Sequence, residues 1–229
     1  QSDPTSLGIW LAGVELLVFS HHSSLSSPDI ANAQNIRDVR RHPDRLRAWC
    51  SVNPNYPDIT SADLRDYDRH ADVWVGLKLH PDIHGVAMSS KAYQYALSFA
   101  DERRLPVLSH TWGGSPFNGA AEVRAVAERY LGITLLLGHS LHAAWQEATD
   151  IARSHANVCL ELTAVPDERS GVIERFVREA GSTKVVFGTD FPWFNHHYYI
   201  GAVLAAEITD EERRDIFYRN AERILGIAR

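Results

Sequence analysis

Short apolar runs and amphipathic helical patterns alternate along almost the whole chain, and this alternation limits the fold more than any other feature. Seven runs rich in β-branched residues and leucine read as strands, at 13–20, 47–52, 73–79, 106–109, 133–138, 157–162 and 184–188. Helical patterns follow them at 28–41, 60–70, 89–104, 119–131, 143–154, 170–180 and 198–226. Because short strand–helix–strand connections are right-handed crossovers, the sequence predicts an α/β fold around a parallel sheet.

Two architectures share this alternation, the doubly wound sheet and the (β/α)₈ TIM barrel. The barrel is favoured because nearly every strand ends in a polar or turn residue, no Gly-x-Gly-x-x-Gly follows the first strand, and no break divides two domains. We therefore expect one barrel domain over residues 1–229, made of strands two to eight and C-terminal helices. Since a barrel needs eight strands, we expect the first to lie upstream of Gln1, which is not an initiator methionine.

Composition narrows the class of partner. The net charge is −6 with acidic and basic residues interspersed, which predicts no nucleic-acid partner and no membrane partner, and leaves a small-molecule substrate. No apolar run approaches the roughly 18 residues of a membrane helix. Cys50 and Cys159 are isolated in apolar runs, so we expect buried free thiols and a cytoplasmic protein. Whether the chain forms a homo-oligomer is left open.

Three strands end in side chains that can bind a metal. His110, His139 and Asp190 each follow an apolar run, at intervals of about one and about two strand–helix units. In a barrel the carboxyl ends of the strands meet at one face, where the active site forms. Neutral imidazoles and carboxylates suit Zn²⁺, so these three residues predict a metal-dependent catalytic site.

Six blocks of the chain resemble, in the same order, those of the amidohydrolase-related metal-dependent hydrolases. These blocks are 76–81, 106–111, 133–139, 157–163, 185–192 and 220–226. The resemblance implies a TIM barrel in which His110, from strand five, is a metal ligand. Asp190, from strand eight, would bind the metal and accept a proton from metal-bound water. His139, from strand six, would polarise the substrate, position the water or bind a second metal.

The chain departs from this family at its beginning. The family's first strand ends in a His-x-His pair, and the sequence contains none. His21 and His22 are adjacent and would face opposite sides of a strand, and a proline turn separates His80 from His84. We expect the pair upstream of Gln1, because His110 and Asp190 alone would hold Zn²⁺ poorly.

Further residues are candidates for the substrate pocket. We predict substrate-binding roles for Lys78, His80, Trp112 and Trp193, which lie at or just beyond strand ends. The tryptophans would suit a planar substrate. Lys78 could instead be carboxylated and bridge two metals, as in some members of the family.

Other histidine, glycine and threonine residues near the strand ends have simpler interpretations. His21 and His22 could reach the substrate. Gly113-Gly114 could cradle an anion, although glycines of a loop with positive φ are commoner. We expect His196 and His197 to be exposed loop residues, and Thr209 to cap a solvated helix.

Three functions remain open at this point. The first is hydrolysis of a small amide, ester or lactone by metal-activated water. The second is non-oxidative decarboxylation of an aromatic or unsaturated acid, in which the metal binds the acid and His139 assists protonation. The third is a non-catalytic barrel that lacks the first-strand ligands.

Overall fold

The sheet contains seven parallel strands in chain order. The computed structural model describes residues 13–165 and 170–227. Its strands are β1 (Leu17–Phe19), β2 (Leu46–Ser51), β3 (Trp74–Leu79), β4 (Pro106–Trp112), β5 (Thr134–His142), β6 (Val158–Glu161) and β7 (Val185–Val186). Each strand pairs in parallel with the next one along the chain. The parallel α/β fold predicted from the alternation is confirmed.

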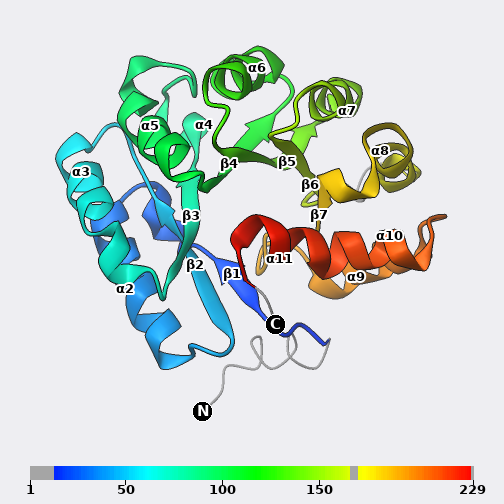
Figure 1. Ribbon diagram of the computed structural model, residues 1–229, viewed down its shortest axis with the longest axis horizontal. Helices are drawn as coiled ribbons and strands as arrows, with labels where there is room; N and C mark the ends of the chain where they lie inside the picture. The colour runs from blue at the N-terminus through cyan, green and yellow to red at the C-terminus, as the bar shows by residue number, and fades with distance from the viewer. Residues whose placement is uncertain (1–12, 166–169, 228–229) are drawn as a thin grey trace.

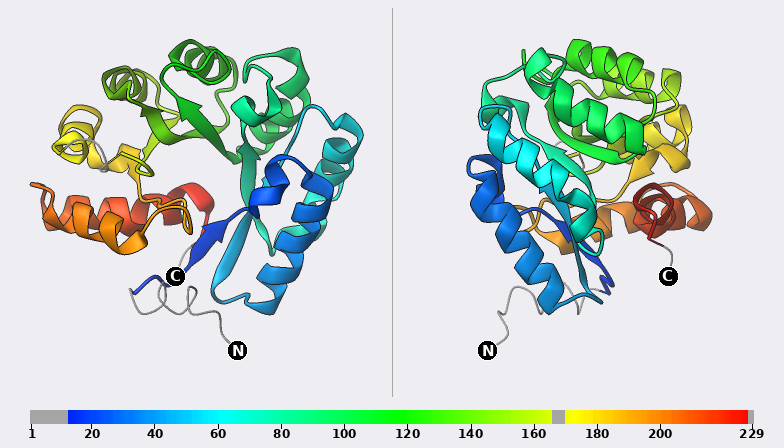
Figure 2. Two further views of the ribbon diagram at one scale, coloured as in Figure 1. Left: turned by 180° about the vertical axis from the view of Figure 1, so that it is seen from behind. Right: turned by 60° about the vertical axis from the view of Figure 1, so that its left-hand side comes forward.

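Helices surround the outside of the curled sheet (Figures 1 and 2). The α-helices are α2 (Pro28–Arg41), α3 (Pro57–Arg65), α4 (Pro81–His84), α5 (Gln94–Arg103), α6 (Ala120–Arg129), α7 (Trp145–Ser154), α8 (Val172–Ala180), α9 (His196–Ala205), α10 (Asp210–Arg214) and α11 (Asn220–Leu225). Four 3₁₀ turns are η1 (His22–Leu25), η2 (Tyr67–His70), η3 (Lys91–Tyr93) and η4 (Ser182–Lys184), and η5 (Asp215–Arg219) is a π-helical turn. The first helical prediction, 28–41, has the bounds of α2.

Two other helix starts differ from the prediction by three or more residues. The helix expected from residue 60 begins at Pro57, because Thr60 does not cap it and its hydroxyl donates to the carbonyl of Asn53 at 3.0 Å. The helix expected from residue 89 begins only at Gln94, after η3 has buried Tyr93. By contrast, Thr209 caps α10 as predicted, in a capping box with Glu212.

The ring of strands does not close within the part of the chain that the structure describes. β1 and β7 are the two edges of the sheet, and neither pairs with a further strand there. These are also the shortest strands, with three and two residues. The structure therefore shows a curled seven-stranded sheet, and the complete eight-stranded barrel is not seen.

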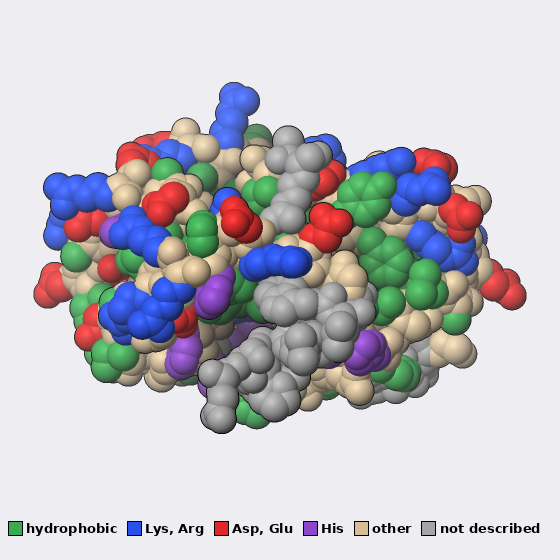
Figure 3. Space-filling view, turned by 90° about the horizontal axis from the view of Figure 1, so that it is seen from below, with side chains coloured by type: hydrophobic (Ala, Val, Ile, Leu, Met, Phe, Trp, Pro, Cys, Tyr) green, Lys and Arg blue, Asp and Glu red, His purple; other side chains and the backbone are tan. Residues whose placement is uncertain are grey.

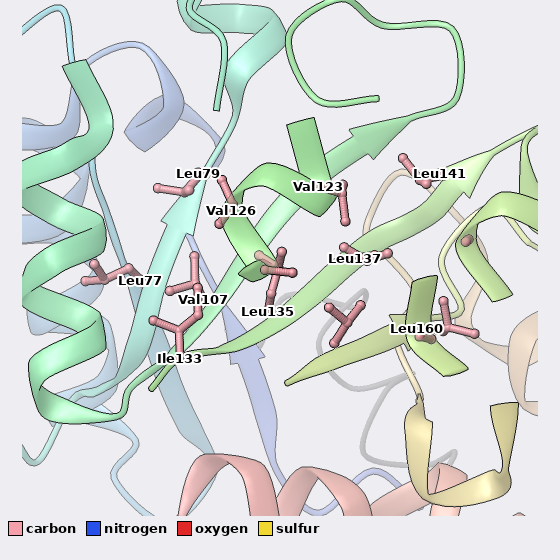
Figure 4. Packing of buried hydrophobic residues seen from close by; sticks show 14 of the residues in the cluster. Leu77, Leu79, Val107, Val123, Val126, Ile133, Leu135, Leu137, Leu141 and Leu160 are labelled. Carbon is pink, nitrogen blue, oxygen red and sulfur yellow. The ribbon is translucent and has the colours of Figure 1, made fainter. Parts of the chain in front are cut away.

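Two apolar clusters lie on the two faces of this sheet. The larger cluster fills the space between the strands and the surrounding helices, and Figure 4 shows Leu135 and Leu137 of β5 in it beside Val123 and Val126 of α6. The smaller cluster lies on the inner face and contains Trp49, Val75, Leu136, Cys159 and Val186. Side chains of α11, among them Ile224 and Leu225, pack against it from the open side.

A β-bulge sets the direction of the side chains at the end of β3. Ala48 of β2 pairs with Trp74, but Cys50 pairs with Leu77, so β3 contains one extra residue between these pairs. As a result, Val75 and Lys78 both face the interior, which strict alternation would not allow. Gly76 lies in the bulge, and a Cβ there would be 2.2 Å from the carbonyl oxygen of Pro106.

Both cysteines are buried free thiols, as the sequence predicted. Among the helices in the described ranges, none is long and apolar enough to cross a membrane. On the face drawn in Figure 3, basic and acidic side chains are interspersed.

Candidate active site

A cavity of about 370 Å³ opens inside the curled sheet, and residues from all seven strands or their carboxyl ends line it. The ionisable side chains that line it are His22, Lys78, His80, His110, His139, Glu161, Asp190 and His196. Its aromatic walls are formed by Phe19, Trp49, Phe187, Phe191, Trp193 and Phe217. The strand-end residues predicted from sequence therefore meet in one cavity, with the exception of Trp112.

Three imidazole rings lie in contact at the ends of β3, β4 and β5. The ring of His80 stacks on that of His110, with centroids 4.1 Å apart and planes at 11°. His139 approaches His110 edge-on at 4.6 Å. Since these strands are neighbours in a parallel sheet, their last inward side chains are forced together.

Trp112 forms a second layer behind these rings and does not line the cavity. It stacks at 3.9 Å on His142 and lies parallel to His110 at 5.8 Å. Trp112 is 38% exposed. It therefore does not line the pocket as predicted from sequence, and instead covers His110 and His142 from outside. His142 was not predicted, although its place three residues after His139 puts it on the same turn.

Burial keeps the three imidazoles neutral. Burial lowers the pKa of His110 to about 2, with further lowering from His80, His139 and Lys78. Burial and the charge of Lys78 lower the pKa values of His80 and His139 to about 3. Nδ1 of His139 is buried and has no hydrogen-bond partner among the described residues. Neutral imidazoles with free lone pairs are the form that binds metals.

Lys78 and Glu161 form the charged floor of the cavity. Burial lowers the pKa of Lys78, and the negative charges of Asp190 and Glu161 oppose that shift. Burial raises the pKa of Glu161, against hydrogen bonds from Thr163 and from the backbone of His139. Glu161 was not predicted, although a carboxylate that ends an otherwise apolar strand is a visible sequence signal.

A second unpredicted carboxylate, Asp82, lies behind His110. Nε2 of His110 is 3.4 Å from Oδ2 of Asp82. Asp82 accepts hydrogen bonds from Ser115 at 2.5 Å and from Asn118 at 2.6 Å, so its position is well determined. Such a carboxylate beside a ligating histidine orients the ring.

The last residues of β5 turn in the left-handed region. His139, Ser140 and Leu141 have φ values of 66°, 46° and 52°, which non-glycine residues rarely adopt. The Ser140 hydroxyl donates to the carbonyl of Glu161 at 2.8 Å, and the Leu141 N–H donates to Thr111 Oγ1 at 3.0 Å. These bonds hold a strained turn that carries His139, as strained backbone at functional sites often does.

The opposite wall of the cavity is more exposed. Asp190 follows β7 with φ 49° and is exposed, and Trp193 is 64% exposed. Trp193 contacts the ring of His22 edge-on at 5.2 Å. His22 therefore lines the cavity, whereas His21 accepts a hydrogen bond from Ser23 N at the start of η1.

Two sequence expectations near the site are wrong. His196 is buried against Phe191, whereas His197 is exposed, because α9 turns the first of the two histidines inward. Gly113 and Gly114 do not have positive φ. Gly113 instead allows close packing of two loops, because a Cβ there would lie 2.5 Å from Cβ of Ala144.

The predicted metal site is incomplete in the described residues. His110 and Asp190 are donors of the right chemistry and line the same cavity. Within residues 13–165 and 170–227, however, no group of three His, Cys, Asp or Glu side chains is close enough to hold a metal ion. These residues do not form a metal centre by themselves, and His21 and His22 do not complete one.

Solved structures share this fold at low sequence identity. An uncharacterised TIM-barrel protein from Bordetella bronchiseptica superposes with a TM-score of 0.83 and 19% identity, covering 96% of this chain and 81% of that one. 2,6-Dihydroxybenzoate decarboxylase from Rhizobium gives 0.78 and 17%, covering 99% and 88%. A dihydroxybenzoic acid decarboxylase from Polaromonas sp. JS666, with bound manganese and 2-nitroresorcinol, gives 0.78 and 15%, covering 100% and 87%.

One curated protein matches part of the sequence. Mitochondrial intermediate peptidase 1 of Cryptococcus neoformans var. neoformans serotype D (strain B-3501A) is 34% identical over 128 residues. The match covers 47% of this chain and 16% of that protein, so this chain corresponds to a small part of its length.

A protein-family model decides the family. The amidohydrolase model matches residues 17–227, which contain all seven strands and the whole cavity apart from Val14 and Leu16. This chain belongs to the amidohydrolase family.

Proposed function

We propose that this chain supplies most of the active site of a metal-dependent decarboxylase that acts on a small planar acid without oxidising it. The observation that carries the proposal is the make-up of the cavity. Half-buried Lys78 and neutral His80, His110 and His139 lie on one side, and aromatic walls face them. Flat apolar walls suit a ring or a conjugated chain, and the ammonium group suits its carboxylate.

Each polar residue then has a role. Lys78, with His80 beside it, would hold the substrate carboxylate. His139, whose imidazole is neutral, would relay the proton that replaces the carboxylate. Trp193 would cover the substrate at the mouth, since its ring is exposed there. Loss of carbon dioxide disperses a negative charge, which a low-dielectric cavity favours over the solvated carboxylate.

The proposal also includes a divalent metal ion and an eighth strand that closes the barrel. The family uses divalent metals, and His110 and Asp190 would be two of the ligands. A strand seated between the free edges of β1 and β7 would close the barrel and bring the remaining donors. Solved relatives that share the fold support this, because they include manganese-bound decarboxylases and a TIM-barrel protein. We propose that the ion is either manganese or zinc.

Hydrolysis is the second candidate. It is favoured by the position of Asp190, an exposed carboxylate at the mouth where water has access. There it could take the proton from an attacking water. A small ester, amide or lactone would be the substrate.

Product analysis separates the two reactions. The purified protein, loaded with Mn²⁺ or Zn²⁺, would be given 2,6-dihydroxybenzoate, 5-carboxyvanillate and a panel of aryl esters and lactones in ¹⁸O-labelled water. Release of carbon dioxide with no label in the organic product supports decarboxylation. Label in a released acid, without carbon dioxide, supports hydrolysis and contradicts our proposal.

Metal analysis tests whether the protein is catalytic at all. A metal enzyme should retain about one equivalent of divalent ion per chain after reconstitution and dialysis. Less than about 0.2 equivalents, together with no turnover on either panel, would support the third reading, a barrel without catalytic function.

A further inference from the structure

Glu161 is a buried carboxylate at the end of β6 that the proposed reaction does not use directly. Only 8% of its surface is exposed. Oε2 accepts a hydrogen bond from the backbone N–H of His139 at 3.2 Å. Oε1 accepts from the N–H of Thr163 at 3.0 Å and also from the Thr163 hydroxyl. One side chain therefore joins the ends of two neighbouring strands.

A glycine just after β7, the strand next to β6 in the sheet, makes room for this carboxylate. A Cβ on Gly188, just after β7, would lie 1.6 Å from Oε1 of Glu161 and 3.1 Å from the Thr163 hydroxyl. No side chain can coexist with the observed position of the carboxylate, so Glu161 touches the backbone beyond β7. The φ of Gly188 is not in the left-handed region, so the need for glycine here is one of space.

The His139 N–H that donates to Glu161 belongs to a strained part of the backbone. His139 begins the left-handed turn at the end of β5, and its N–H donates to Glu161. The next residue, Ser140, is tied to the carbonyl of Glu161 by its hydroxyl. The first two residues of the turn are thus both anchored on Glu161, one through its side chain and one through its backbone.

Charge adds a second connection, across the cavity. The negative charges acting on half-buried Lys78 are those of Asp190 and Glu161. Asp190 lies at the exposed mouth, whereas Glu161 is buried. Of these two carboxylates, Glu161 is therefore the one that solvent screens less.

We propose that Glu161 is a positioning residue: its carboxylate, admitted by Gly188, holds the turn that aims His139. The part of this inference that concerns catalysis rests on the proposed function. The part that concerns His139 does not, because the turn can be observed without turnover.

Two substitutions disturb the same carboxylate from different sides. Glu161→Gln keeps the shape but removes the charge and exchanges one acceptor oxygen for an amide donor. Gly188→Ala leaves Glu161 in place but forces its carboxylate to move. Gly201→Ala is the matched control, because a Cβ on Gly201, in α9, meets nothing within 4 Å.

The primary readout is hydrogen exchange of the His139 amide and the ¹⁵N signals of its imidazole, measured in all variants whose thermal unfolding remains cooperative. We expect faster exchange and shifted ring signals in Glu161→Gln and Gly188→Ala, and wild-type values in Gly201→Ala. Wild-type His139 signals in both site variants would overturn the inference, whatever the activity.

The second readout is kinetic and uses a double variant. We expect each site variant to lower kcat about 10- to 100-fold, as loss of a supporting hydrogen bond does, with KM changed less than about threefold. The double variant should be no worse than the more affected single variant, since both act on one group. Fully additive losses, or a kcat unchanged in both, would overturn the positioning role. If the wild-type protein has neither activity, the proposed function fails and the His139 signals alone decide.

Discussion

The two sides of the cavity differ in how completely the described chain builds them. On one side, β3 to β6 are four to nine residues long, and hydrogen bonds hold several polar groups near their ends. Glu161 and Asp82 each accept bonds from more than one neighbour. On the other side, β1 and β7 have three and two residues, and Asp190 and Trp193 are exposed.

This difference shows which part of the site the fold has already organised. Side chains on the closed side are held by contacts between neighbouring parallel strands, so His110, His139 and Lys78 have their positions before any ligand binds. On the open side, the free edges of β1 and β7 carry backbone groups without a strand partner in the described residues. Such edges readily pair with another strand. We therefore expect chemistry to be most sensitive on the open side and stability on the closed side.

The largest effect should come from Asp190→Asn, on the open side. We expect kcat/KM to fall by about 10³-fold or more, because Asp190 is proposed to bind the metal and, if the reaction is hydrolysis, to accept a proton. The side chain is exposed, so circular dichroism and the unfolding midpoint should stay near wild type. These are compared with steady-state kinetics on whichever substrate is turned over. An active Asp190→Asn variant would refute its role in proton transfer.

The next effect tests the closed side through the bulge of β3. Gly76→Ala should destabilise the protein by about 2–4 kcal/mol, because a Cβ would collide with Pro106 O and with the Trp49 ring. Urea unfolding measures this loss. Gly114→Ala is the control, since a Cβ there meets nothing within 4 Å and should leave the midpoint unchanged. A stable Gly76→Ala protein would mean that the bulge is not what turns Lys78 inward.

Metal binding should stabilise the folded protein, because the proposed ligands come from both sides of the cavity. At a free Mn²⁺ or Zn²⁺ concentration about 100-fold above Kd, we expect about 2.7 kcal/mol of added stability, because the ion binds the folded state alone. Thermal unfolding with metal and with chelator gives the difference. His110→Ala should remove the gain, whereas His70→Ala, remote from the cavity, should keep it. A gain that survives in His110→Ala would place the metal elsewhere.

The smallest effect near neutral pH is a dependence of stability on pH, which grows only as the pH falls. The pKa values of His80 and His139 are about 3 in the folded protein, against 6.5 for an ordinary histidine. Between these values the unfolded chain binds more protons than the folded one, so the free energy of unfolding falls as pH falls from 6.5 towards 3. Urea unfolding across this range should show a shallower fall in His80→Gln. An equal fall in both proteins would mean that His80 is not neutral by burial.

Much of the fold was predictable because it follows from local patterns. Each of the seven predicted strands overlaps an observed one. β4 and β5 extend further than predicted, and β1 and β7 are shorter than predicted because they are edges. Of the candidate site residues, His110, His139 and Asp190 were predicted to converge because each follows an apolar run in the sequence, and all three line the cavity. The carboxyl ends of parallel strands converge at one face, so the side chains at these ends were expected to lie near one another.

The residues that were missed depend on contacts between distant parts of the chain. Asp82 is recognisable only once Ser115 and Asn118 are seen to bond it. The place of Glu161 at the end of an apolar strand was visible in the sequence, but its contacts with His139 and Gly188 were not. The burial of His196 and the withdrawal of Trp112 behind His110 are likewise decided by packing.

By itself the sequence determined the order and type of the elements, the parallel sheet and the three strand-end side chains, since apolar periodicity and strand ends are local properties. Only the tertiary structure decided which side chains face the cavity, that Gly76 shifts the alternation of β3, and that one carboxylate aims His139. Those outcomes depend on which strands lie side by side and how closely their backbones approach, and no local pattern records either.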